Sequence, residues 1–348
     1  MNYPKKVTIG DITVRDGFQH EEKFIPTEAK LWVLEQLILA GVKHLEVTNF
    51  GNPKGMPQFK DADLLFKGIR TSKNVQHLLS GVSLTAVTIR ERAVERAIQA
   101  KLEGYGPDRI LFMVSTSETH HIKNSGLSLA DYWKMCEKYI PMAHAAGMKV
   151  NGTVSTIWGC PMEGPTEMKK AVEFAERWLA IGANDVEHAD HDGSAAPNRV
   201  YDYFSMLLDR VQNPQKHIAH FHVTRGWGTA NVLAALQAGM TNFESALGGL
   251  GGQPANFVDG SPVSGTGAYY YKDASAVGLV QTEDMVVMMD EMGIDTGLDI
   301  DKILETGKMV ERIVGRQLRS ETLRNGRIPK SLSGKKDKIS TPEKTLII

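Results

Sequence analysis

The fold is decided by a repeating pattern that is clearest in residues 109–155, RILFMVSTSETHHIKNSGLSLADYWKMCEKYIPMAHAAGMKVNGTVS. Arg109–Ser115 and Lys149–Ser155 are short runs with apolar and β-branched residues, which is typical of strands. Between them, Leu129–Ala146 has the length and apolar spacing of a helix, and Gly147 is placed to end it. A strand, a helix and a strand in this order predict two parallel strands joined by a helical crossover.

The same unit recurs along most of the chain. The expected strands are Val7–Val14, His44–Thr48, Leu84–Thr88, Arg109–Ser115, Lys149–Ser155, Asp185–Ala189, His217–Val223 and Asn242–Leu247. The expected helices between them are Thr27–Ala40, Ala62–Thr71, Arg90–Leu102, Leu129–Ala146, Thr166–Ile181, Arg199–Val211 and Thr229–Ala238. About eight units over about 250 residues predict an α/β fold, a (β/α)8 TIM barrel. An open doubly wound sheet is the alternative, but Asp16-Gly17-Phe18 is no phosphate-binding Gly-x-Gly-x-x-Gly turn.

The chain divides by pattern into three parts. We expect residues 1–280 to form the catalytic barrel, residues 281–325 to form C-terminal helices packed on the barrel, and residues 326–348 to form a polar tail.

Composition excludes several classes of function. The chain has 348 residues, with 40 Lys and Arg against 41 Asp and Glu, so its charge favours neither nucleic acid nor a membrane surface. Its two cysteines exclude a disulfide framework. The first residues carry no targeting signal, and no apolar run approaches the roughly 20 residues that span a bilayer. We therefore expect a cytoplasmic protein.

Active sites of such barrels lie at the carboxyl ends of the strands, so polar residues there are candidates. The first expected strand ends in Arg15-Asp16, which alone would more often be a structural ion pair. Glu46 lies inside the second strand with the parity of Thr48. A buried carboxylate needs a partner, and Arg15 is available.

The seventh strand carries His220-Phe221-His222. Side chains at i and i+2 of a strand point to the same side, so two imidazoles there can hold one ion, although paired structural histidines are equally common. With Asp16 the set becomes two nitrogens and one carboxylate. That mixture suits a divalent ion with open positions, such as Mg, Mn, Fe or Zn.

Two further segments are candidates. The sixth strand ends in Glu187-His188-Ala189-Asp190-His191-Asp192, which predicts substrate hydrogen bonding or proton transfer, with a solvated loop as the alternative. The last strand is followed by Gly248-Gly249-Leu250-Gly251-Gly252, a loop that can approach a ligand closely or move as a lid. It lacks the Lys-Ser/Thr of a P-loop, which argues against nucleotide hydrolysis.

Together these residues resemble the 3-hydroxy-3-methylglutaryl-CoA lyase family, within a wider group of metal-dependent barrel lyases and Claisen-condensing synthases that share a pyruvate carboxyltransferase domain. The resemblance runs roughly from Val7 to Gly297. The motifs that carry it are Arg15-Asp16-Gly17 with Gln19, Glu46-Val47-Thr48-Asn49-Phe50, Gly159-Cys160-Pro161, Asp190 to Pro197, His220-x-His222 and Gly248 to Gly252.

The resemblance implies a role for each motif. It implies a divalent cation, expected as Mg or Mn with Zn or Fe as alternatives, on Asp16, His220 and His222. It also implies that Arg15 stabilises an enolate oxygen and that Glu46 orients Arg15. It places Asp190 beside the metal as a substrate contact, and places Gln19, Gly251, Gly252 and Gln253 along the substrate and lid.

The chain departs from the family in three places. Gln253 stands where family lyases carry a proton-transferring cysteine, and an amide does not titrate. Gly278 or Leu279 stands at the position of an asparagine metal ligand, for which Asn256 is a candidate substitute. Val223 stands where the family has an aspartate.

The function we expect is a metal-dependent carbon–carbon lyase that cleaves a 3-hydroxyacyl-CoA, or a related hydroxy acid, through an enolate. His191, or else His188, is the candidate for the proton transfer that Gln253 cannot perform. One alternative is an acyl-CoA-dependent condensing synthase of the citramalate, citrate or isopropylmalate type, acting on a 2-oxo acid. Another is a barrel that has lost catalysis and binds a ligand. The resemblance implies an acyl-CoA as the small-molecule partner and a homodimer.

Overall fold

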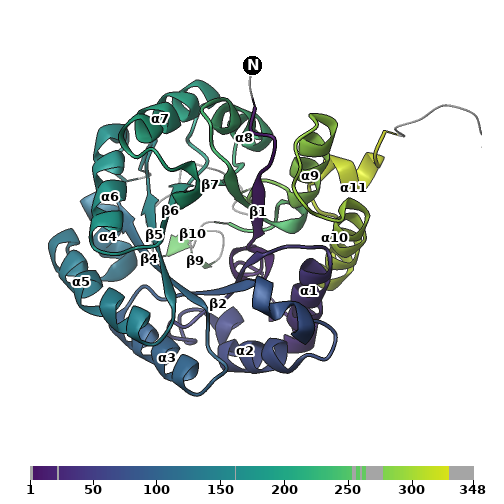
Figure 1. Cartoon of the computed structure of the whole chain (residues 1–348), viewed down its shortest axis with the longest axis horizontal. Helices are drawn as coiled ribbons and strands as arrows, with labels where there is room; N and C mark the ends of the chain where they lie inside the picture. Colours follow the sequence, from purple (N-terminus) through teal and green to yellow (C-terminus); the bar gives the residue numbers. More distant parts are fainter. Residues whose placement is uncertain are drawn as a thin grey trace, which may run out of the picture.

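Eight parallel strands close into a barrel in the order β1 to β8 (Figure 1). The computed structural model describes residues 3–21, 23–160, 162–252, 256–258, 261–263 and 277–328. The barrel strands are β1 Thr8–Asp11, β2 His44–Asn49, β3 Ser83–Val87, β4 Arg109–Ser115, β5 Lys149–Ser155, β6 Asp185–Asp190, β7 His217–Phe221 and β8 Asn242–Ser245. The register runs Thr8 opposite Asn242 where β1 meets β8, which closes the sheet. The predicted (β/α)8 barrel is confirmed.

A ring of helices covers the barrel (Figure 1). The helices are α1 Thr27–Leu39, α2 Ala62–Thr71, α3 Glu91–Leu102, α4 Glu118–Ser125, α5 Leu129–Ala145, α6 Met168–Ala180, α7 Pro197–Arg210, α8 Gly228–Gln237, α9 Thr282–Glu291, α10 Ile300–Val314 and α11 Glu321–Asn325. α9 contacts α8 and α10, and α10 packs on α1. The segment that follows β8 therefore completes the ring between α8 and α1.

Helix ends follow from local sequence. The side chain of Ser128 accepts a hydrogen bond from the backbone of Asp131 and caps α5, and Asp299 caps α10 in the same way. Gly315 takes a left-handed conformation after α10, which glycine adopts without strain.

The core lies between the outer face of the barrel and the helices. The indole ring of Trp178 in α6 packs at a tilt against that of Trp133 in α5, with 4.6 Å between the ring centroids. Trp178 also stacks on Phe112 of β4. A Cβ on Gly152 of β5 would overlap the Trp178 indole, so glycine is required for this approach. Both cysteines are free and buried, and Cys160 contacts the Ser117 hydroxyl at 3.1 Å.

The first strand is shorter than predicted. It ends at Asp11, and Thr13–Gly17 form one turn of π-helix, so the prediction that Thr13 and Val14 continue the strand is wrong. The Asp11 carboxylate accepts a hydrogen bond from the Thr13 backbone N–H at 2.8 Å. The N–H groups of the following turn then converge on the carbonyl of Ile12. This turn places the side chains of Arg15 and Asp16 at the carboxyl end of the barrel.

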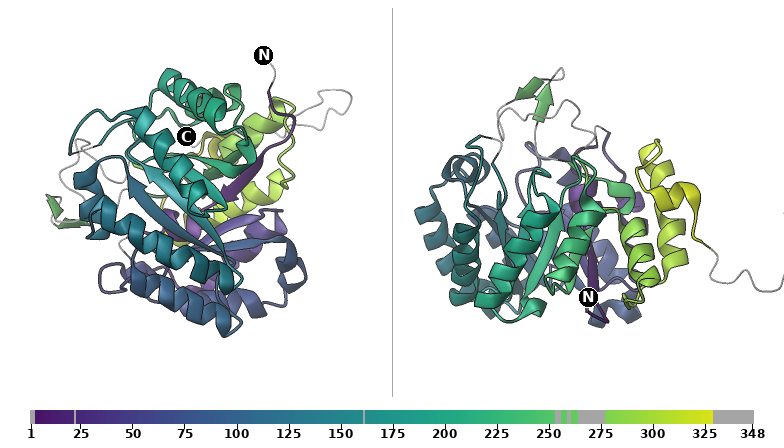
Figure 2. Two further views of the ribbon diagram at one scale, coloured as in Figure 1. Left: turned by 60° about the vertical axis from the view of Figure 1, so that its left-hand side comes forward. Right: turned by 90° about the horizontal axis from the view of Figure 1, so that it is seen from above.

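Two further features were not predicted. α4 lies between β4 and α5, and β9 Asn256–Val258 pairs with β10 Ser261–Val263 in an antiparallel hairpin. Figure 2 places this hairpin beyond the barrel end that lies away from the N-terminus. None of the described helices combines the length and apolar character needed to cross a membrane.

Candidate metal centre and active site

Asp16, His220 and His222 come together at the carboxyl end of the barrel. His220 belongs to β7, His222 is the first residue after that strand, and Asp16 lies on the π-helical turn after β1. The two Nε2 atoms are 3.2 Å apart, and Oδ2 of Asp16 lies 3.9 Å from each of them. All three side chains are buried. The structure thus brings together the three residues that the sequence suggests as metal ligands.

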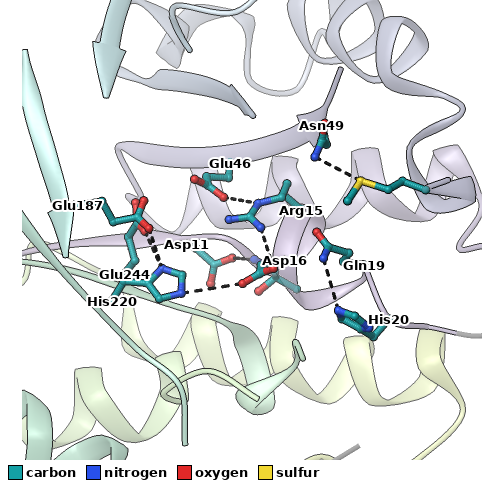
Figure 3. Close-up of polar contacts among 12 residues, drawn as sticks. Asp11, Arg15, Asp16, Gln19, His20, Glu46, Asn49, Glu187, His220 and Glu244 are labelled. Carbon is teal, nitrogen blue, oxygen red and sulfur yellow. Dashed lines mark hydrogen bonds and ion pairs between the residues drawn. The ribbon is translucent and has the colours of Figure 1, made fainter. Parts of the chain in front are cut away.

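His220 is oriented from behind by two carboxylates (Figure 3). Its Nδ1 lies 3.2 Å from Glu244 of β8 and 3.4 Å from Glu187 of β6. Because a carboxylate accepts, this Nδ1 carries the proton, and Nε2 keeps its lone pair toward Asp16. Sequence reasoning missed Glu244, although a carboxylate inside a short strand is the same signal that drew attention to Glu46.

The donor set fits a divalent cation. Two imidazole nitrogens and one carboxylate oxygen, with separations of 3.2–3.9 Å, have the spacing of neighbouring ligands on one ion. Burial would raise the pKa of Asp16, but Arg15 and then His222 hold it below its ordinary value. Burial, helped by His220, lowers the pKa of His222 to about 3. The ionised carboxylate and the neutral ring are the forms that bind metals.

Arg15 connects this cluster to β2. Its Nη1 donates to Asp16 Oδ1 at 2.7 Å, and its Nε donates to Glu46, so the predicted partnership is present (Figure 3). All three groups are buried. Burial raises the pKa of Glu46 to about 7, against the pull of Arg15. The guanidinium is therefore held in place beside the candidate metal ligands by two acceptors.

At the end of β6, the side chains of His188, Asp190 and His191 point to different surroundings. The Asp190 carboxylate accepts from the backbone N–H of Ala195 at 3.1 Å, so it orders the following loop and does not join the described metal-ligand cluster. Burial, and then Asp192, raise its pKa well above the ordinary value. His191 turns toward the cluster, with its ring centroid 6.4 Å from that of His222.

His188 points the other way. Its Nδ1 pairs with the Tyr203 hydroxyl of α7 at 2.7 Å, and its Nε2 pairs with Nδ1 of His217 at 2.9 Å. The ring also packs edge-on against Phe204 of α7. The structure therefore removes His188 as a candidate for proton transfer at this site and leaves His191.

The glycine-rich loop begins against the π-helical turn. A Cβ on Gly251 would lie 3.6 Å from the carbonyl oxygen of Asp16, and one on Gly252 would lie 3.1 Å from the His20 ring. Gln19 lies beside that ring, with its Nε2 3.4 Å from Nε2 of His20. Gln253 lies outside the described residues. His20 is a site residue that sequence reasoning missed.

The position of the expected asparagine ligand is also visible. Leu279 forms a bridge with His222, and the Gly278 carbonyl accepts from the Val223 N–H at 2.8 Å. Neither Gly278 nor Leu279 has a side-chain oxygen, so this segment offers no side-chain ligand beside His222. The side chain of Asn256 lies outside the described part of the chain.

A closed (β/α)8 barrel with two histidines and an aspartate converging at its strand ends defines the class of metal-dependent barrel enzymes. The sequence matches the HMGL-like family over residues 6–310, and the chain belongs to this family. The family predicted from the motifs is thereby confirmed.

Relatives and solved structures agree. The chain is 35% identical over 324 residues to the hydroxymethylglutaryl-CoA lyase of Bacillus subtilis, covering 93% of this chain and 98% of that protein. A crystal structure of a B. subtilis HMG-CoA lyase superposes with a TM-score of 0.81 at 32% identity, covering 93% and 99%. The structure of an HMG-CoA lyase of Acinetobacter baumannii in complex with coenzyme A and 3-methylmalate also superposes with a TM-score of 0.81. It is 28% identical, and the match covers 95% of this chain and 98% of that chain.

Proposed function

We propose that this protein is a metal-dependent carbon–carbon lyase that cleaves a 3-hydroxyacyl-CoA of the 3-hydroxy-3-methylglutaryl-CoA type. The observation that carries the proposal is that Arg15 is held by Glu46 and by one oxygen of Asp16, whose other oxygen lies 3.9 Å from His220 and from His222. A buried cation aimed at such a cluster stabilises negative charge that develops on an oxygen during C–C cleavage. An acyl-CoA substrate is supported by the relatives, which are hydroxymethylglutaryl-CoA lyases, and by the coenzyme A in the A. baumannii structure.

Asp16, His220 and His222 would hold a divalent cation, which we propose to be Mg²⁺ or Mn²⁺, with Zn²⁺ or Fe²⁺ as alternatives. When bound, the ion would act as a Lewis acid toward the hydroxyl and carbonyl oxygens of the substrate. Glu187 and Glu244 would keep His220 in the tautomer that turns Nε2 to the ion.

The reaction needs one proton moved twice. A base takes the proton of the C3 hydroxyl, the C–C bond breaks to give a ketone and a thioester enolate, and the proton then goes to the enolate carbon. We propose that His191 carries this proton and that Arg15 donates to the enolate oxygen while Glu46 keeps Arg15 in place. Asp190 would act through the 191–195 loop that it orders.

The substrate would be enclosed by residues from two neighbouring segments. Gln19, with Gly251 and Gly252 packed on the same turn, would line the entrance, and Gln253 would follow on the lid. Because an amide does not titrate near neutral pH, Gln253 would contact the substrate without acting as a general acid or base.

The test is a direct assay with purified protein and Mg²⁺ or Mn²⁺. We expect 3-hydroxy-3-methylglutaryl-CoA to yield acetyl-CoA and acetoacetate, and chelation to abolish the reaction. A parallel reaction with acetyl-CoA and 2-oxo acids measures thiol release, which would instead indicate a condensing synthase. Tight metal binding without turnover in either direction would indicate a binding protein and overturn the proposal.

We also propose that the protein acts in the cytoplasm as a homodimer. Support for the first point comes from the HMG-CoA lyase of B. subtilis as a bacterial relative and from the absence of a membrane-spanning helix among the described residues. The homodimer rests on the family resemblance. Light scattering on the purified protein tests the dimer.

A further inference from the structure

We propose that His120 is a positioning residue, which fixes the tautomer of His191 so that a lone pair on His191 Nδ1 is presented to the metal centre. The inference deepens the proposed function and rests on it for the chemical meaning of that lone pair. Its structural part, the tautomer of His191, can be tested without any activity.

A buried chain of hydrogen bonds leads from β5 to His191. Ser155 at the end of β5 contacts Ser115 at the end of β4, with 2.9 Å between the hydroxyl oxygens. The Ser115 hydroxyl lies 2.6 Å from Nδ1 of His120 on α4, and Nε2 of His120 lies 2.9 Å from Nε2 of His191. All four side chains are buried, so water does not compete for these bonds.

The first link fixes the direction of every later one. The Ser155 hydroxyl donates to the backbone carbonyl of Val114 at 3.2 Å, and a carbonyl only accepts. Ser155 therefore accepts from Ser115. Ser115 has then used its one proton, so it accepts from Nδ1–H of His120.

Neutral imidazole has one donor and one acceptor nitrogen, so Nε2 of His120 must accept. Burial lowers the pKa of His120 to about 4, which keeps the ring neutral near neutral pH. Nε2 of His191 consequently carries a proton that it donates to His120. The lone pair of His191 is therefore left on Nδ1.

The position of His191 gives this lone pair a use. The ring lies between His120, at 4.4 Å between centroids, and His222, at 6.4 Å. A substrate hydroxyl at the metal centre would meet an acceptor that already has the correct tautomer. The proton leaves the hydroxyl oxygen for Nδ1 and later goes from Nδ1 to the enolate carbon, so no further reactant is needed. His191 would thus supply a proton carrier in a chain whose sequence has Gln253 in place of the family's cysteine.

The first experiment observes the tautomer. In ¹⁵N-histidine-labelled, metal-loaded protein, we expect the spectrum of His191 to show a protonated Nε2 and an unprotonated Nδ1. In His120→Phe and in Ser115→Ala, the fixed tautomer should give way to a mixture. His121→Phe is the matched control, because His121 is equally buried on α4 but bonds Ser125. A His191 tautomer that is unchanged in both chain variants, or an Nδ1–H tautomer in the wild type, overturns the proposal.

The second experiment observes turnover. His120→Phe and Ser115→Ala should lower kcat about 10- to 100-fold, as loss of an orienting hydrogen bond does, with KM changed less than about threefold. Ser115→Thr keeps the hydroxyl and should restore kcat, and His121→Phe should match wild type. If the wild type shows the expected tautomer but has no lyase activity, the proposed function fails and the positioning role stands. If activity is present and all these variants match wild type, the positioning role fails alone.

Discussion

Nε2 of His220 lies 3.2 Å from Nε2 of His222, on the side of both rings that faces Asp16. Two neutral imidazoles do not approach through their ring nitrogens without a shared proton or a shared cation. His220 has committed its own proton to Glu187 and Glu244 on its opposite edge. Nε2 of His220 is therefore an acceptor, which either the Nε2 proton of His222 or a cation between the rings satisfies, and Asp16 supplies a negative charge 3.9 Å away.

Metal affinity should depend on these residues individually. We predict that Asp16→Asn and His222→Gln each weaken Mn²⁺ binding at least about tenfold, since the first removes the negative charge and the second removes an imidazole nitrogen from the set of three candidate ligands. Isothermal titration of the metal-free protein measures this. His77→Gln, which changes an exposed histidine away from the cluster, is the control and should bind like wild type. Equal affinity in all four proteins would place the metal elsewhere.

Arg15 should matter for the rate more than for binding. Lysine keeps the charge but cannot contact Glu46 and Asp16 through a planar fork, so Arg15→Lys should lower kcat about 10²- to 10³-fold. Steady-state kinetics with the acyl-CoA substrate would show this with little change in KM. Arg70→Lys, which alters a pair with Asp108 before β4, should keep kcat. A normal kcat in Arg15→Lys would contradict the role of Arg15 at the enolate oxygen.

The barrel could be predicted because each strand and each long helix carries its own local signal. Thr13 and Val14 were misassigned because their β-branched side chains favour a strand, whereas the Asp11 carboxylate captures the Thr13 N–H and turns the chain. α4 escaped prediction because Glu118–Ser125 is almost entirely polar and has no apolar stripe.

The candidate site was predictable where residue types alone suggest chemistry, as for Asp16, His220 and His222. The sequence could not show in which direction each side chain points. His188 and His191 are three residues apart, and the sequence offers both as candidates for proton transfer. Only the fold shows that His188 contacts Tyr203 and that His191 contacts His120. Likewise, the sequence could not show that the Asp190 carboxyl group accepts from the Ala195 N–H, and its contact with the substrate stays a prediction.

The different directions of the two rings predict different kcat values for the two variants. His191→Ala should lower kcat, and because it also leaves the buried Nε2 of His120 without its partner, it should lower the free energy of unfolding by about 1–3 kcal/mol. His188→Ala leaves Tyr203 and His217 without their partners and opens a cavity, so the free energy of unfolding should fall by about 2–4 kcal/mol. kcat of folded His188→Ala should stay within about threefold of wild type. Urea unfolding and steady-state kinetics on both variants measure these effects, and similar kcat values would refute the assignment.

The last prediction concerns Glu283, a buried carboxyl group on α9 whose oxygens accept from the Gly248 N–H at 2.7 and 3.0 Å. Burial raises its pKa to about 8, from an ordinary value of 4.5. Between these values the folded protein holds a proton that the unfolded chain has released. The contribution of Glu283 to stability is therefore complete below about pH 4.5 and is lost as the pH rises toward 8, by about 1.4 kcal/mol per pH unit.

Glu283→Gln resembles the protonated side chain at every pH and lacks this dependence. The free energy of unfolding of wild type, relative to Glu283→Gln, should therefore decrease by about 2–3 kcal/mol between pH 5.5 and 7.5 in urea titrations. Glu305→Gln, on an exposed position of α10, should show a constant difference from wild type over the same range. If wild type instead gains stability relative to Glu283→Gln as the pH rises, then the carboxylate is ionised in the fold. The Gly248 N–H would in that case outweigh the cost of burial at the base of the glycine-rich loop.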